Sequence, residues 1–418
     1  MQLKTKSIKG MTLALLMLIA AMAGCIGSED ETTEEEETKA AFLDASDAGY
    51  TYASNVDNHR SLMQDLCDIK TAASENNWAE AKSIYTEGKN AEKSDGSFRT
   101  LAGFAAAEGK NHNYDTFYNQ TGAIGAHIMA AMDGTGDFEG ASDTVRYQGI
   151  AKLTANMGMV GYTIHELNAA VAKADAGNTD NDSGAPHNWD EGWAFFHGPD
   201  EHWSCSPAYT MKKRAADYGT ETDGVSNALS ASEQAMVDGL AALQAGDKTA
   251  YDAATETVVK NIIITYSQAT LKYTMKMDSN ESAAKYQAEG YAFWKTMEAY
   301  AAPYTDGCYN MAVHKVFMMG DIDASTCDAF MWTQHQGQGD YMCYNTVTHQ
   351  VSTDVSNETE CDGYAAAYFQ DMYGADKINE ILNLKDASKH GTSYDIAPHL
   401  ERVWAHYGIT ADDIGTYA

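Results

Sequence analysis

The side chains of this sequence that could bind a metal ion are concentrated between residues 162 and 202. Tyr162, His165 and Glu166 are spaced at i, i+3 and i+4, so one face of a helix would present a phenol, an imidazole and a carboxylate. Oxygen-rich ligands with one or two imidazoles suit a ferric ion or manganese, and a phenolate favours the ferric ion. The following loop and helix add further ligand types: His187, Asp190, Glu191, His197, Asp200, Glu201 and His202.

Each of these residues also has a purely structural interpretation. His165 could be a hydrogen-bonded core histidine, Tyr162 could simply pack, and the loop histidines could be exposed. Both interpretations stay open at this point. The segment predicts one metal site, whose candidate ligands are Tyr162, His165, Glu166, Asp190, Glu191 and His197.

A short phrase near these residues occurs twice. Glu191–Phe196 (Glu-Gly-Trp-Ala-Phe-Phe) returns as Glu289–Trp294 (Glu-Gly-Tyr-Ala-Phe-Trp). In each copy the glutamate lies four residues before a phenylalanine, so acid and ring share one helical face. A carboxylate that enters an aromatic interior needs a partner, since burying an unpaired charge costs several kcal/mol or shifts its pKa. The phrase predicts a duplicated fold and adds Glu289 to the candidate ligands, although both glutamates could instead point to solvent.

Histidines lie near Glu191 but not near Glu289, which favours the first copy as the principal site. Aligning Tyr162-Thr163 with Tyr273-Thr274 brings two long helices into register and places His165 opposite Lys276. The scaffold therefore repeats in this prediction, while the polar chemistry does not.

The elements that carry these residues are predicted to be helices. Only five prolines interrupt 418 residues, and long stretches have helical periodicity. We expect a mostly α fold, a duplicated helical bundle of two pseudo-symmetric lobes followed by a disulfide-stapled C-terminal segment. The best candidate for a β-hairpin is 345–355. Predicted helices include 143–175, 248–278, 281–301, 363–373, 376–384 and 394–407.

The N-terminus has the pattern of an exported lipoprotein. A basic start and an apolar run lead into Ala23-Gly24-Cys25, which predicts a signal peptide over 1–24 and a lipid on Cys25. Residues 25–40 are rich in glutamate and should form an acidic tether. The remaining predicted domains are a first lobe over 41–180, a second lobe over 181–305 and a cysteine-rich segment over 306–418.

Charge and cysteine content exclude some functions. The formal net charge of −32 argues against nucleic acid and anionic lipid headgroups as partners. Without Cys25, six cysteines remain, and an even set in an exported protein predicts disulfides. Their connectivity does not follow from the sequence.

No motif of a nucleophilic enzyme is present. The sequence lacks Gly-x-Ser-x-Gly, His-Glu-x-x-His, a P-loop and the Rossmann glycine spacing. The pair His165-Glu166 matches part of a zinc peptidase helix, but position 169 is alanine. We therefore expect a binding protein and not an enzyme, with an exported imelysin-like, metal-dependent helical hydrolase as the alternative.

A second notable segment is 84–101, where Lys89 and Arg99 stand out in an acidic chain. Arg99 followed by Thr100 near a helix start could hold a small anion through charge-assisted hydrogen bonds. Arg99 could equally pair with one of the many carboxylates.

The segment 85–101, together with Trp189–Phe195, resembles the algal iron-assimilation family of low-iron-inducible periplasmic proteins and phytotransferrins. The resemblance covers residues 45–305 and implies a cell-surface or periplasmic protein that binds ferric iron, Fe(III), together with carbonate. It implies Arg99 and Thr100 on the carbonate side, and the candidate ligands named above on the metal side. The lipid signal and the acidic tether depart from the algal pattern.

The sequence thus predicts a lipid-anchored, extracytoplasmic ferric-iron-binding protein that captures iron for uptake. The lipid on Cys25 would hold it to the outer face of the cell membrane. An iron permease is the expected partner, and no nucleic acid is expected.

Overall fold

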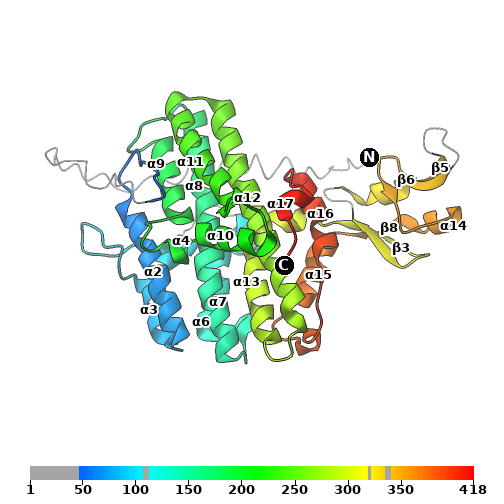
Figure 1. Ribbon diagram of the computed structural model, residues 1–418, viewed down its shortest axis with the longest axis horizontal. Coiled ribbons are helices and arrows are strands. Elements are labelled where there is room, and N and C mark those ends of the chain that lie inside the picture. Colours follow the sequence, from blue (N-terminus) through cyan, green and yellow to red (C-terminus); the bar gives the residue numbers. More distant parts are fainter. Residues whose placement is uncertain (1–46, 107–112, 319–321, 335–339) are drawn as a thin grey trace, which may run out of the picture.

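The computed structural model describes residues 47–106, 113–318, 322–334 and 340–418. They form a helical body with a small β module at one end (Figure 1). The prediction of a mostly α fold is confirmed. The predicted signal peptide, the lipidated Cys25 and the acidic tether lie outside the described residues.

The helical body is built from two series of helices. Those before residue 206 are α2 (Asp57–Ser74), α3 (Trp78–Glu87), α4 (Leu101–Ala105), α5 (Asn113–Tyr118), α6 (Ala123–Asp133), α7 (Asp143–Lys152), α8 (Met159–Asp175) and α9 (Ala185–Phe196). Those after it are α10 (Pro207–Tyr218), α11 (Asn227–Ala245), α12 (Lys248–Met275), α13 (Ala283–Ala301), α15 (Tyr373–Ile381), α16 (Ala397–His406) and α17 (Ala411–Ile414).

The chain also contains short segments of other helical types. The π-helical segment η2 (Leu153–Gly158) joins α7 to α8 without a break. The 3-10 turns are η1 (Gly136–Phe138), η3 (Trp203–Cys205), η4 (Lys276–Asp278), η5 (Ala302–Tyr304), η6 (Ala324–Ala329) and η7 (Ala387–Lys389).

Local sequence explains where several helices begin and end. The side chains of Ser142, Ser206 and Ser226 each accept a hydrogen bond from a backbone N–H three residues later, which caps α7, α10 and α11. Gly219 and Gly246 end α10 and α11 in the left-handed conformation that favours glycine.

The helices of both series share one hydrophobic core, which extends from Tyr50 to Ile414. α8 packs on α9, α12 packs on α11 and α13, and α13 contacts α7. The glycines of the repeated phrase allow close packing: a Cβ on Gly192 would lie 3.1 Å from Leu167 Cδ2, and one on Gly290 would lie 2.8 Å from Leu382 Cδ2. The duplication into two lobes stays a prediction.

The C-terminal part is less helical than predicted. The expected helix at 363–373 is wrong, because this segment forms strand β8 and pairs with β3. Its alanines favour a helix locally, but pairing within the sheet overrides that propensity. The strands, with one short helix, are β3 (Gly307–Asn310), β4 (Lys315–Met318), β5 (Phe330–Gln334), β6 (Tyr341–Asn345), β7 (Val351–Ser352), α14 (Glu358–Cys361) and β8 (Tyr364–Gln370).

These strands form two antiparallel sheets of order β4-β3-β8 and β5-β6-β7. The hairpin expected at 345–355 is confirmed in part, since β6 pairs with β7. A further hairpin joins β1 (Glu221–Thr222) to β2 (Val225–Ser226) in the helical body. Helices α15 to α17 belong to the main core and not to the β module, whose small core is separate.

The β module contains an internal repeat that the sequence analysis missed. Cys308-Tyr309-Asn310 with His314 recurs as Cys343-Tyr344-Asn345 with His349. In both copies the tyrosine hydroxyl bonds to the histidine Nδ1, at 2.8 and 2.7 Å. The last strand of each copy pairs with the first strand of the other, β5 with β6 and β8 with β3. Each copy therefore supplies one strand to the sheet that contains the first strand of the other copy.

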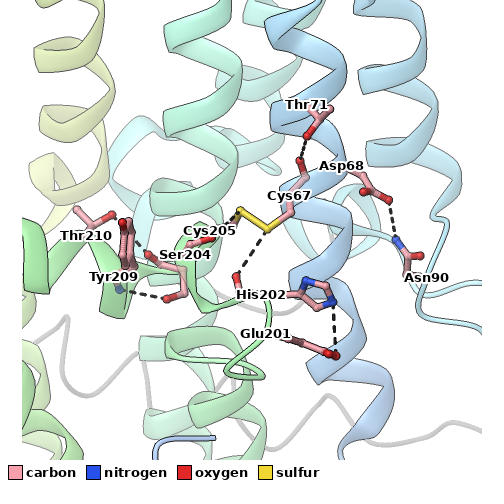
Figure 2. The surroundings of a disulfide bond; sticks show 11 residues. Cys67, Asp68, Thr71, Asn90, Glu201, His202, Ser204, Cys205, Tyr209 and Thr210 are labelled. Carbon is pink, nitrogen blue, oxygen red and sulfur yellow. Dashed lines mark hydrogen bonds and ion pairs between the residues drawn. A yellow bond between two sulfur atoms is a disulfide. The ribbon is translucent and has the colours of Figure 1, made fainter.

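The six predicted disulfide cysteines form three bonds. Cys308–Cys327 and Cys343–Cys361 each close one copy of the β-module repeat. Cys67–Cys205 links α2 to η3, close to His202 (Figure 2). This third bond fixes α2 against the chain that follows α9.

None of the described helices has the length and apolar content needed to span a bilayer.

The Cys67–Cys205 bond should stabilise the helical body, because it closes a loop of 138 residues. We expect the double variant Cys67→Ser, Cys205→Ser to lower the free energy of unfolding of the helical body by about 2–5 kcal/mol. Urea denaturation followed by circular dichroism measures this change.

The matched control is the double variant Cys343→Ser, Cys361→Ser. Because that bond lies in the separate core of the β module, the helical signal should keep its wild-type midpoint. Equal shifts in the two double variants would contradict the prediction.

Candidate metal site

The candidate site is centred on the carboxylate of Glu191. Its Oε1 atom lies 3.2 Å from His59 Nε2 and 3.2 Å from His187 Nε2. Asn188 Nδ2 donates a hydrogen bond of 2.5 Å to Glu166 Oε2 and approaches Glu191 Oε2 at 3.4 Å. We call His59, Glu166, His187, Asn188 and Glu191 the Glu191 cluster. It brings together side chains from α2, α8 and α9.

His165 and Tyr162 lie on α8 beside this cluster. His165 Nε2 is 3.9 Å from Glu166 Oε1, and its side chain is partly exposed. Tyr162 is buried, with its ring 4.5 Å from Phe104 and 5.2 Å from Phe195. Burial, together with Glu166, raises the pKa of Tyr162 well above its usual value. Its phenol is therefore neutral at physiological pH, and phenolate ligation would require the charge of a metal ion.

His187 is held on both ring nitrogens. Nδ1 lies 2.8 Å from Ser54 Oγ, and Nε2 faces Glu191. The hydrogen bond to Glu191 raises the pKa of His187, and burial opposes this shift. Because the folded-state pKa is raised, the pair stabilises the fold fully below about pH 6.5, the ordinary histidine value, and this contribution is lost as pH rises through the raised pKa.

Asp190 has a different environment from Glu191. Its two oxygens accept hydrogen bonds from the Tyr50 hydroxyl, the backbone N–H groups of Ala53 and Ser54, and the Ser54 hydroxyl, at 2.8–3.0 Å. Burial raises the pKa of Asp190 to about 7, although these donors lower it. Its contacts anchor the segment before α2 onto α9, and its role as a metal ligand stays a prediction.

His197 also has neighbours outside the Glu191 cluster. Its ring stacks between Trp193 and Trp203, with centroid distances of 5.1 and 5.5 Å, and Nδ1 lies 2.7 Å from Gly198 O. Burial lowers the pKa of His197. These contacts match the alternative of a packed histidine, while ligation by His197 stays a prediction.

Within the described part of the chain, Glu289 has a lysine and not a histidine among its neighbours, since it interacts with Lys152 and with the Tyr273 hydroxyl. That hydroxyl also interacts with Arg214. The second copy of the phrase therefore places its glutamate near basic side chains. This finding agrees with the expectation that the polar chemistry differs between the copies.

Arg99 and Thr100 directly precede helix α4, and a side chain of α4 reaches the Glu191 cluster. Thr100 caps α4 by accepting a hydrogen bond of 2.8 Å from Gly103 N–H. One turn later, Phe104 contacts the rings of His59 and Phe195, at 5.8 and 5.1 Å. Arg99 is partly buried, and within the described ranges its Nε has no hydrogen-bond partner.

The side chains of the Glu191 cluster contact one another through ion pairs and hydrogen bonds. Among the residues that the structure describes, no group of three or more histidine, cysteine, aspartate or glutamate side chains is already arranged to hold a metal ion. A metal would therefore have to draw these side chains closer together.

Comparison with protein-family models gives one match, to the Low iron-inducible periplasmic protein (Fea1) family over residues 15–315. The chain belongs to this family. The family match confirms the resemblance read from the sequence and indicates a role in iron assimilation at a periplasmic location. Comparisons with curated proteins and with solved structures give no significant match.

One residue at the centre of the site of this Fea1-family protein was missed in the sequence. His59 lies 132 residues before Glu191, so sequence spacing does not connect the two. The available signal was its position in α2, where His59 shares the buried stripe with Leu62, Met63 and Leu66. A histidine within an apolar helical stripe needs a polar partner from elsewhere in the fold.

Asp190 should be important for the stability of this Fea1-family fold. Asp190→Ala would remove the acceptor of four hydrogen bonds and leave the buried Tyr50 and Ser54 donors without it. We expect a loss of about 3 kcal/mol in the free energy of unfolding. Urea denaturation measures it, and Glu201→Ala, at a largely exposed position, is the control. Equal stability of both variants would show that these hydrogen bonds contribute little.

Proposed function

We propose that this Fea1-family protein binds ferric iron at the Glu191 cluster and captures it outside the cell for uptake. The observation that supports the proposal is the convergence of two imidazoles, from His59 and His187, on Glu191 Oε1 at 3.2 Å each. Ligand atoms about 2.1 Å from one metal ion, at angles near 100°, lie roughly 3.2 Å from each other. Each of the two contacts thus has the spacing of neighbouring ligands in a coordination shell, while the cluster as a whole would still have to close around the metal.

The chemistry of the donors also fits a ferric cargo. Glu166 and Glu191 supply carboxylates, His59 and His187 supply imidazoles, and carboxylates suit a hard trivalent ion. Tyr162 lies close enough to Glu166 for the carboxylate to affect its pKa. Loss of the Tyr162 proton on iron binding would add a phenolate, and His165 would join from the edge of the cluster.

A carbonate ion is the proposed companion of the iron. Arg99 supplies a positive charge and a buried Nε–H donor, and Thr100 begins the helix that carries Phe104 to the Glu191 cluster. Carbonate on this side would offset the charge of Fe(III) and occupy coordination positions that protein atoms leave open.

We further propose that the protein is lipid-anchored through Cys25 at the outer face of the cell membrane. The acidic tether over 25–40 would hold the helical body away from the surface, where an iron permease would receive the cargo. The proposed activity is binding and not catalysis.

Replacing the central carboxylate tests the iron site. We expect Glu191→Gln to weaken Fe(III) binding at least tenfold at neutral pH, because the amide loses the negative charge and offers a poorer ligand. Competition with citrate in bicarbonate buffer, followed by visible absorption, measures the affinity.

The matched control is Glu201→Gln, which removes one carboxylate from a largely exposed position. It should bind iron as the wild type does, and binding should weaken when bicarbonate is omitted. Wild-type affinity in Glu191→Gln would contradict the site. Zinc-dependent peptide hydrolysis that is abolished in Glu166→Ala would favour the imelysin-like hydrolase instead.

Proton competition gives a second test. His187 must lose its Nε2 proton to bind iron, and its hydrogen bond to Glu191 raises its pKa. Apparent iron affinity should therefore fall as pH drops through that raised value, about tenfold per pH unit for one proton. In His187→Gln the slope of log affinity against pH should decrease by about one, whereas His202→Gln should keep the wild-type slope. An unchanged slope in His187→Gln would exclude this histidine as a ligand.

A further inference from the structure

Basic side chains gather around the second copy of the repeated phrase. Lys152 ends α7, Arg214 lies on α10 and Lys272 on α12, and the carboxylates among them are Glu289 and Asp217. Lys70 and Lys213 also act electrostatically on Lys152, and Lys276 acts on Lys272, so cations outnumber the two carboxylates in this region. This excess is unusual in a chain of net charge −32.

Arg214 is the most deeply buried of these cations, with a side chain only 6 % exposed. Its Nη2 lies 2.9 Å from Asp217 Oδ2, but Asp217 Oδ1 is also 2.7 Å from Lys272 Nζ. In the described part of the chain, Nε and Nη1 of Arg214 have no hydrogen-bond partner. Buried donors of a charged group are costly to leave without acceptors, which favours a further acceptor for the Arg214 guanidinium beside the Tyr273 hydroxyl.

Arg214 and Lys152 both lie close to the ring of Phe293. Arg214 Cζ lies 5.9 Å from the centroid of Phe293 and 5.6 Å from that of Tyr273, and Lys152 Nζ lies 5.8 Å from the Phe293 centroid. The Tyr273 hydroxyl interacts with Arg214 and Glu289. Burial lowers the pKa of Lys152 to about 8, so its ammonium stays mostly charged at neutral pH.

In both copies of the phrase a tyrosine ring and one further group lie near the phenylalanine, but that further group differs between the copies. In the first, the rings of Tyr162 and His59 lie 5.2 and 5.5 Å from Phe195. In the second, Tyr273 and the Arg214 guanidinium lie 5.5 and 5.9 Å from Phe293. The imidazole that pairs with Glu191 is thus replaced by a fixed cation with spare donors. A buried cation with spare N–H donors favours an anion as its ligand.

We propose that Lys152 and Arg214 bind a small monovalent inorganic anion next to Phe293. The excess of cations offsets the charge of an anion, and a monovalent ion leaves water at a lower desolvation cost than a divalent ion. The π-helical segment η2 begins directly after Lys152, and such segments are frequent at functional sites. No residue of the Glu191 cluster takes part, so the inference does not depend on iron binding.

Nitrate is the probe, since its planar oxygens match guanidinium donors. The iron-free protein at pH 7.0 in gluconate buffer is titrated with sodium nitrate at constant ionic strength, by calorimetry and by thermal unfolding. We expect saturable binding at one site and a rise in the unfolding midpoint, because a ligand of the folded state stabilises it. Sulfate should bind at least tenfold more weakly.

Variants that remove a positive charge and a variant that removes a negative charge should change nitrate affinity in opposite directions. Arg214→Met should weaken nitrate binding at least tenfold, and Lys152→Met should also weaken it. Glu289→Gln should tighten it, because it removes a negative charge beside the anion. Lys248→Gln, which removes a cation from the exposed pair with Asp175, should bind nitrate as the wild type does.

The proposal is overturned if nitrate shows no saturable binding, or if folded Arg214→Met keeps wild-type affinity. Unchanged or weaker binding in Glu289→Gln also overturns it, and that variant decides the question if Arg214→Met does not fold.

Discussion

Glu191 Oε1 is shared by the imidazoles of His59 and His187, and the organisation of the helical body depends on this interaction. A carboxylate in an aromatic interior is stable only with donors, so the helices that supply these donors must stay in register. Helix α2 supplies one imidazole and α9 supplies the other together with the carboxylate. The Cys67–Cys205 bond secures α2 eight residues beyond His59, and the Asp190 hydrogen bonds secure the chain that leads into α2.

The same constraint explains how two copies of one phrase differ in chemistry. Each copy places a glutamate and, four residues later, a phenylalanine on the same helical face. The group that meets them comes from another helix, α2 in one case and α10 in the other. Because that helix carries His59 at the first copy and Arg214 at the second, one carboxylate stays available to a cation while the other is embedded in excess positive charge.

Local pattern was sufficient to predict much of the fold but only part of the site. Helical periodicity predicted the helices that carry Tyr162, His165, Glu166 and Glu191, and the even cysteine count predicted the disulfides. The contact between His59 and Glu191 depends on tertiary packing across 132 residues, so no spacing rule reveals it. The strand β8 was misread because its alanines favour a helix, while its partner β3 lies more than 50 residues earlier.

The exchange of strands in the β module has a consequence for export. The disulfides within each copy close loops of only 18 and 19 residues, so each can form as soon as its own copy has crossed the membrane. The first copy, however, leaves the edge of β3 unpaired until β8 arrives with residues 364–370. Until then the exposed edge can pair with other chains, which is a common route to aggregation. The order in which the chain emerges thus leaves this edge open until residue 370 has appeared, when only α15 to α17 of the main core are still to follow.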